Sequence, residues 1–174
     1  MKNIFHSVED IDISILYTIN NSIKCKKLDW FMPKITYLGS TQFSVGICLL
    51  LFMYHGELIH IFSIKFILSL IVSTFLVWSV KLTFNRTRPF IKLEDLYVKK
   101  ISVDNYSLPS AHSAAAFSMA ITTFMFFPLL GIIFVALACC VAISRIYIGV
   151  HYPTDVFLGI LIGIICSLMI FHFY

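Results

Sequence analysis

The sequence predicts an all-α membrane protein, a polytopic bundle of about five transmembrane helices with an amphipathic interfacial helix at its N-terminal end. Of the 174 residues, 59% are hydrophobic and only 13% are charged, whereas a soluble domain carries about 25% charged residues. The apolar residues also gather in stretches of about 20 residues, the length at which a helix crosses a bilayer. Both observations fit one membrane-embedded domain over residues 1–174.

Five stretches have the length and composition of a crossing, at residues 35–54, 61–80, 108–127, 128–147 and 154–174. The uncharged run from Ser113 to Ser144 is too long for one crossing. Pro128 and Gly131 interrupt this run, so it is expected to fold as a helical hairpin. In the last crossing, Gly159-x3-Gly163 favours close helix packing within the chain over packing in a dimer.

Residues 9–23 differ from these five stretches because their apolar residues alternate with polar ones. Ile11, Ile15 and Ile19 recur at helical spacing, and Asp12 and Asn20 are among the polar residues between them. This pattern is typical of an amphipathic helix that lies on a membrane surface.

Charge and cysteine usage exclude several other classes of protein. The net charge is +4, and the basic residues form no stripe of the kind that binds nucleic acid. The five cysteines have no metal-binding spacing, and no carboxylate cluster suits Mg²⁺. We therefore expect no metal, no cofactor, no nucleic acid and no obligatory protein partner.

Nearly all unusual polar residues lie at four helix ends that five crossings would place on one side of the membrane. They occur in the segments 81–89, 107–112, 144–145 and 151–155. Lys81 and Arg88 are two helical turns apart and would share a face if the helix continued to the following proline. Arg86, between them, is expected to be an interfacial anchor or, as the weaker alternative, a substrate contact.

The third crossing would begin with Pro109 in its first turn and Ser107 as a possible cap. Free N–H groups at such a helix start favour an anion. At the last crossing, the i, i+4 spacing would place His151 and Asp155 on one face, with the helix beginning around Pro153.

Together these residue types suit phosphoryl transfer. Lys81, Arg88 and Arg145 supply the positive charge that a phosphate requires. One of two histidines could attack phosphorus while the other protonates the leaving oxygen, and a neighbouring carboxylate could orient the attacking ring.

The order Lys-x6-Arg-Pro, Pro-Ser-x-His, Ser-Arg-x5-His-x3-Asp resembles the three signature motifs of the type 2 phosphatidic acid phosphatase superfamily, over about residues 10–174. The resemblance implies that His151 is the nucleophile and forms a phosphohistidine, that Asp155 orients it, and that His112 is the general acid. It also implies phosphate contacts from Lys81, Arg88, Ser110, Ala111 and Arg145. Position 111 departs from the commonest motif, which has glycine there; alanine keeps the backbone N–H.

The implied activity is metal-independent hydrolysis of a lipid phosphate or diphosphate in the bilayer. Undecaprenyl diphosphate is the favoured substrate by resemblance to small bacterial members. Phosphatidylglycerophosphate or phosphatidate hydrolysis and lipid phosphotransfer are alternatives within enzymes. A non-enzymatic transporter or lipid-binding relative is the alternative outside them.

The expected location is a bacterial cell membrane, and two arguments about orientation disagree. Most Lys and Arg residues of the short loops lie on the side of the motifs, which by the positive-inside rule would make that side cytoplasmic. Some of these charges are explained by phosphate binding, however, and the resemblance implies an extracytoplasmic active site. We expect the extracytoplasmic orientation.

Overall fold

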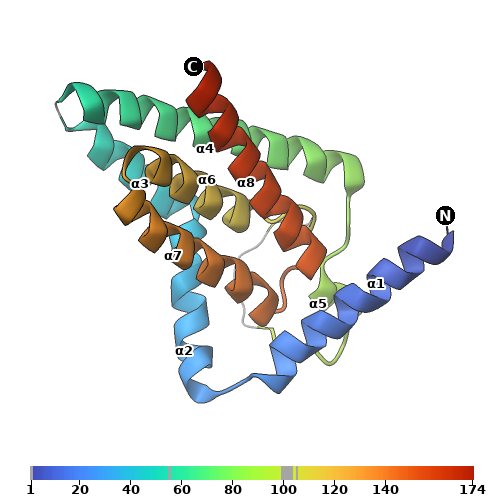
Figure 1. Ribbon diagram of the computed structural model, residues 1–174. Coiled ribbons are helices and arrows are strands. Elements are labelled where there is room, and N and C mark those ends of the chain that lie inside the picture. The colour runs from blue at the N-terminus through green and yellow to red at the C-terminus, as the bar shows by residue number, and fades with distance from the viewer. Residues whose placement is uncertain (1, 55, 99–103, 105) are drawn as a thin grey trace.

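A computed structural model describes residues 2–54, 56–98, 104 and 106–174, with side chains described from residue 9 onward. The described residues form a helical bundle (Figure 1). Its elements are α1 (Lys2–Tyr17), η1 (Thr18–Ser22), α2 (Lys26–Ile35), η2 (Thr36–Gly39), α3 (Thr41–Phe52), α4 (Glu57–Phe84), α5 (Pro89–Lys92), α6 (Ala111–Phe126), α7 (Pro128–Tyr147) and α8 (Pro153–Phe173).

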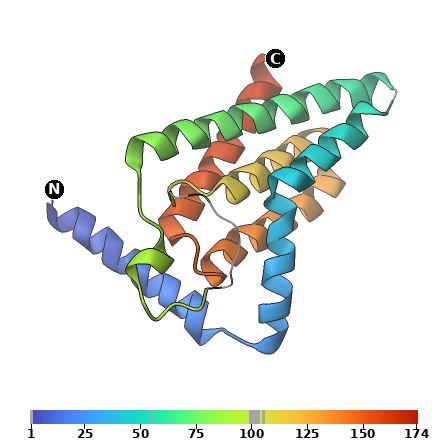
Figure 2. The ribbon, with the colours of Figure 1, turned by 180° about the vertical axis from the view of Figure 1, so that it is seen from behind.

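Helix α6 is the centre of the bundle and packs against α4, α7 and α8 (Figures 1 and 2). Two glycines of α8 make the contact with α6 possible. A Cβ atom at Gly163 would lie 2.5 Å from the Ala114 carbonyl oxygen, and one at Gly159 would lie 2.5 Å from that of Ser110. The predicted role of the Gly-x3-Gly pattern in packing within the chain is confirmed.

The predicted hairpin between the third and fourth crossings is also confirmed. Helix α6 ends at Phe126 and α7 begins at Pro128, whose missing N–H suits the first position of a helix. The predicted start of α6 was wrong. Ser110, not Ser107, is the N-cap, and its side chain accepts a hydrogen bond from the Ser113 N–H. Pro109 therefore lies just before the helix.

Among the described residues, three helices are long and apolar enough to cross a membrane, namely α4, α7 and α8. The segments Lys26–Gly39 and Thr41–Phe52 would provide a fourth crossing as a pair bent by 51°. Helix α6 is apolar but shorter, with 16 residues or about 24 Å. The structure confirms an all-helical bundle among the described residues, while the count of five crossings stays a prediction.

The first predicted crossing, 35–54, is not a continuous helix. The chain leaves helical geometry at Ser40, which has an extended backbone. The Ser40 side chain accepts a hydrogen bond from the Phe43 N–H and so caps the N-terminus of α3. The sequence predicted one span because residues 35–54 are uncharged and mostly apolar, and hydropathy does not detect a cap.

The N-terminal segment is helical, but its polar residues do not all face solvent. Asp12, Leu16 and Asn20 are buried against the bundle, whereas Ile11 and Ile15 are exposed. The C-terminal end of α1 approaches the bundle, and its N-terminal end points away from it in both views (Figures 1 and 2). Its position at a membrane surface stays a prediction.

Candidate active site

The predicted site residues meet at the ends of α4, α6, α7 and α8, beside a cavity of about 860 Å³. Its lining includes six charged or histidine side chains, those of Lys81, Arg88, Asp104, His112, Arg145 and His151. Five of these six residues were predicted from the sequence, and Asp104 was not. The remaining lining is largely apolar and comes from α3 and α4.

Lys81 and Arg88 converge, although not on one face of a helix as expected. Helix α4 ends at Phe84, and Asn85 adopts a left-handed conformation with φ 45°, which asparagine tolerates better than most residues. Arg88 is extended and lies outside α4. A turn, rather than helical periodicity, therefore brings the guanidinium to the ammonium group.

Asp104 lies between these two cations. Its Oδ2 is 2.6 Å from Lys81 Nζ, and its Oδ1 is 2.5 Å from Arg88 Nη2. Partial burial would raise the pKa of Asp104, but its bonds to Lys81 and Arg88 outweigh this effect and lower it. The carboxylate is thus ionised at neutral pH, and it is an anion held by the cations expected to bind phosphate.

Arg145 is buried with little compensation for its charge. Its Nη1 donates to Thr36 Oγ1 at 2.9 Å, and its Nε has no partner among the described residues. Burying a cation without an anionic partner is unfavourable. A guanidinium of this kind beside a cavity suits an anionic ligand.

His151 lies in the loop before α8, with its Nδ1 3.6 Å from Asp155 Oδ2. This oxygen also accepts the Tyr152 N–H at 2.8 Å, and the opposite ring atom, Nε2, is 3.3 Å from Arg88 Nη1. Burial, followed by the charges of Arg145, Arg88 and Lys81, lowers the pKa of His151 well below its usual value. The imidazole is therefore neutral, and its role as the nucleophile stays a prediction. Helix α8 begins at Pro153, as predicted.

The start of α6 presents two of its three predicted residues to the cavity. Ala111 and His112 line it together with Lys81, Arg88, Arg145 and His151. The Ser110 hydroxyl instead is buried and accepts a bond from the Ser113 hydroxyl at 2.9 Å. Ser110 thus shapes the helix start in this structure, and its direct contact with phosphate stays a prediction.

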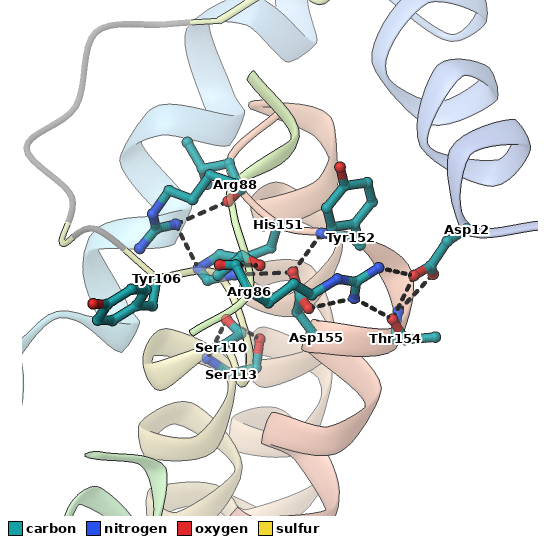
Figure 3. A network of polar contacts seen from close by, with 12 residues as sticks. Asp12, Arg86, Arg88, Tyr106, Ser110, Ser113, His151, Tyr152, Thr154 and Asp155 are labelled. Carbon is teal, nitrogen blue, oxygen red and sulfur yellow. Dashed lines mark hydrogen bonds and ion pairs between the residues drawn. The ribbon is translucent and has the colours of Figure 1, made fainter. Parts of the chain in front are cut away.

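Arg86 is neither an anchor exposed at the membrane surface nor part of the cavity lining. It reaches behind His151 to contact two carboxylates, those of Asp155 and Asp12 (Figure 3). Burial alone would lower its pKa, but these two carboxylates raise it. Arg86 and Arg88 are separated by one residue, and this spacing could have indicated that the two arginines have different roles. Only the fold shows that Asp12 of α1 is a partner of Arg86.

Metal independence stays a prediction. Within the described part of the chain, no group of three or more His, Cys, Asp or Glu side chains is placed to hold a metal ion.

Two solved structures are similar to the whole fold. The crystal structure of Aquifex aeolicus LpxE shares 33% identity with a TM-score of 0.82, covering 94% of this chain and 96% of that one. A transmembrane PAP2-type phosphatidylglycerolphosphate phosphatase from Bacillus subtilis shares 25% identity with a TM-score of 0.78, covering 96% and 86%.

Curated relatives match over shorter segments. The bacitracin transport permease protein BcrC of Bacillus licheniformis is 44% identical over 69 residues, which is 40% of this chain and 34% of that protein. An undecaprenyl-diphosphatase of Sulfolobus acidocaldarius is 33% identical over 104 residues, or 58% and 49%. The matched segments thus span half or less of the length of these two relatives.

The profile of one family matches residues 62–174, a range that contains all three predicted motifs and every residue proposed from them. With the apolar helices of the bundle, these similarities identify an integral membrane protein. The chain belongs to the PAP2 superfamily.

Proposed function

We propose that this protein hydrolyses lipid phosphates or diphosphates through a phosphohistidine intermediate. One observation carries the proposal: a single cavity has the cations and histidines at one end and an apolar wall from α3 and α4 along the rest. A phosphate head and a hydrocarbon tail require these two environments side by side.

The cations and the start of α6 hold the phosphate in the proposed complex. Lys81, Arg88 and Arg145 neutralise its oxygens, and the Ala111 N–H, free at the first turn of α6, donates to one of them. Ser110 orients this turn or donates its own hydroxyl. Because phosphoryl transfer depends mainly on positioning and charge stabilisation, these side chains supply what a metal supplies elsewhere.

The reaction then proceeds in two steps. His151 Nε2 forms a bond to phosphorus as the bond to the leaving oxygen breaks, and His112 gives that oxygen a proton. Asp155 stabilises the positive charge that develops on the His151 ring. In the second step, His112 takes a proton from water, whose oxygen attacks phosphorus and releases phosphate and neutral His151.

Undecaprenyl diphosphate is the favoured substrate because relatives of this chain are named undecaprenyl-diphosphatases. Phosphatidylglycerophosphate is the next candidate, because the structurally similar Bacillus subtilis protein is a phosphatidylglycerolphosphate phosphatase. Phosphatidate completes the set.

Phosphate release by the purified chain in lipid nanodiscs tests the proposal. The panel contains undecaprenyl diphosphate, phosphatidylglycerophosphate and phosphatidate, each with and without EDTA, and His151→Ala is the blank. We expect release that survives EDTA and is absent from the blank. No release from any lipid would overturn the proposed function, and loss of release with EDTA would overturn its metal independence.

The same preparation separates hydrolysis from phosphotransfer. An acceptor lipid alcohol competes with water for the phosphohistidine, so its phosphorylation at the expense of free phosphate would identify a transferase. Free phosphate in equal amounts with and without the acceptor identifies the hydrolase that we propose.

A further inference from the structure

A chain of alternating charges extends from His151 away from the cavity. Arg86 Nη1 donates to Asp155 Oδ1 at 2.7 Å, and Arg86 Nη2 donates to Asp12 Oδ2 at 2.8 Å. Asp155 turns its other oxygen toward His151 (Figure 3). We propose that Arg86 and Asp12 are positioning residues that act on His151 through Asp155. This inference rests on the proposed function of His151.

Asp155 needs a partner because it is fully buried. A buried carboxylate without a cation either carries an uncompensated charge or takes up a proton. In both cases it would no longer orient and stabilise an imidazolium. Arg86 holds Oδ1 while the Tyr152 N–H holds Oδ2. These two bonds fix the plane of the carboxylate, with Oδ2 facing the ring.

Arg86 needs a second carboxylate for the corresponding reason. With Asp155 alone, the guanidinium would draw the negative charge of that residue away from His151. Asp12 is buried and balances Arg86. It is itself fixed by Thr154, whose N–H and hydroxyl both donate to it, at 2.9 and 2.5 Å. The Tyr152 ring covers the guanidinium at 4.1 Å.

Asp12 belongs to α1, outside the residues 62–174 that the family profile matches. The N-terminal helix thus contributes a buried charge to the back of the proposed site. The alternative is a purely structural link that holds α1 against the first turn of α8. Such a link would affect the stability of the protein but not the rate of the chemical step. A positioning role therefore predicts a lower kcat in the variants, whereas a structural link predicts an unchanged kcat.

The test measures kcat and KM of Arg86→Gln, Asp12→Asn, Asp155→Asn and the double variant Arg86→Gln/Asp155→Asn. The full chain is assayed in nanodiscs with the best lipid substrate, below the lowest thermal midpoint of the set. We expect kcat to fall about tenfold or more for Arg86→Gln and severalfold for Asp12→Asn, with KM within about threefold. Arg86→Lys, which keeps the charge but not the two-sided contact, should fall between Arg86→Gln and the wild type.

The double variant gives the decisive comparison. If Arg86 acts through Asp155, its removal should slow an enzyme that already carries Asp155→Asn by less than about twofold. A further loss as large as that of Arg86→Gln alone would overturn the inference.

Glu9→Gln is the matched control, because Glu9 is also on α1 and pairs at 3.4 Å with Lys92 at the protein surface. It should keep the wild-type kcat. Wild-type kcat in both Asp12→Asn and Arg86→Gln would also overturn the inference while leaving the proposed function intact. A wild-type enzyme that releases no phosphate would instead overturn the proposed function.

Discussion

At the scale of single residues, the two histidines of the cavity have different surroundings and therefore different proposed tasks. His151 faces Asp155 on one side and Arg88 on the other, so that the carboxylate can stabilise positive charge on the ring while the guanidinium keeps the resting ring neutral. His112 lies in the first turn of α6 and lines the cavity, where it is the second proton-carrying group that the proposed reaction requires.

The leaving group should separate these tasks. We expect His112→Ala to lower kcat for a lipid phosphate by about 100-fold or more, since general acid catalysis contributes about 10²–10⁴-fold. The loss should be much smaller for an aryl phosphate with the same tail, because its leaving oxygen needs no proton. His151→Ala should abolish both reactions and phosphoenzyme formation.

The exposed His60 provides the control for this comparison. His60→Ala should behave as the wild type with both substrates. Equal losses for the two substrates in His112→Ala would contradict the acid assignment, and substantial activity in His151→Ala would contradict the nucleophile.

Asp104 should compete with phosphate for Lys81 and Arg88. Its pKa is lowered, so it remains charged throughout the neutral range. Because its side chain is 57% exposed, solvent screens the pair, and the competition should be worth no more than about 1 kcal/mol. Asp104→Asn should therefore tighten inhibition by inorganic phosphate up to about fivefold. Asp95→Asn, an exposed carboxylate outside the cavity lining, should not, and equal inhibition constants for both variants would contradict the competition.

At the scale of elements, the break in the first predicted crossing has a consequence for access to the site. Helix α3 begins anew at Thr41 and, with α4, forms the apolar wall of the cavity. Val45, Leu49, Ile71 and Phe75 line this wall and are also substantially exposed. Side chains that both line a cavity and face the membrane suit a tail that enters from the bilayer.

Ile71→Asn tests this role of the wall. Loss of roughly 1 kcal/mol of apolar contact should lower kcat/KM for a long-chain lipid about fivefold. A short-chain phosphate should be hydrolysed as fast as by the wild type. Ile132→Asn on α7 is the control, since Ile132 has 59% exposure against 58% for Ile71 but does not line the cavity. Equal effects of the two substitutions would contradict the proposed path of the tail.

At the scale of the whole molecule, the site and the C-terminus lie at opposite ends of α8. The His151–Asp155 end joins the cavity, while Lys65 near the start of α4 donates to the Phe171 carbonyl at 2.9 Å. Lys65 therefore satisfies one of the free carbonyls at the end of α8, in addition to the snorkelling that its position favours.

The orientation of the bundle can be tested by cysteine labelling. In a background without the native cysteines, Glu94→Cys marks the site side and Glu57→Cys the start of α4 on the other side. An extracytoplasmic site predicts that an impermeant thiol reagent labels Glu94→Cys in intact cells and Glu57→Cys only after lysis. The reverse pattern would place the site in the cytoplasm.

The sequence by itself determined the class of fold and most of the charged and histidine side chains that line the cavity. Apolar length is a local property, so the helices α4, α7 and α8 and the turn before Pro128 were predictable. The motifs were also informative because each lies at a helix end, where a few neighbouring residues decide which side chain faces the cavity. The predicted crossings did not include features that hydropathy does not detect, such as the helix cap at Ser40.

Only the tertiary structure decided which charges meet. Periodicity relates residues within one or two helical turns, whereas Arg86 contacts Asp155 and Asp12 across 69 and 74 positions of the chain. Asp104 likewise reaches Lys81 across 23 positions. Such pairs depend on how α1 and the loops pack against the bundle, and electrostatic attraction acts through space irrespective of sequence distance. Hence the sequence predicted the cations that line the cavity but neither their carboxylate partner nor the buried charges behind His151.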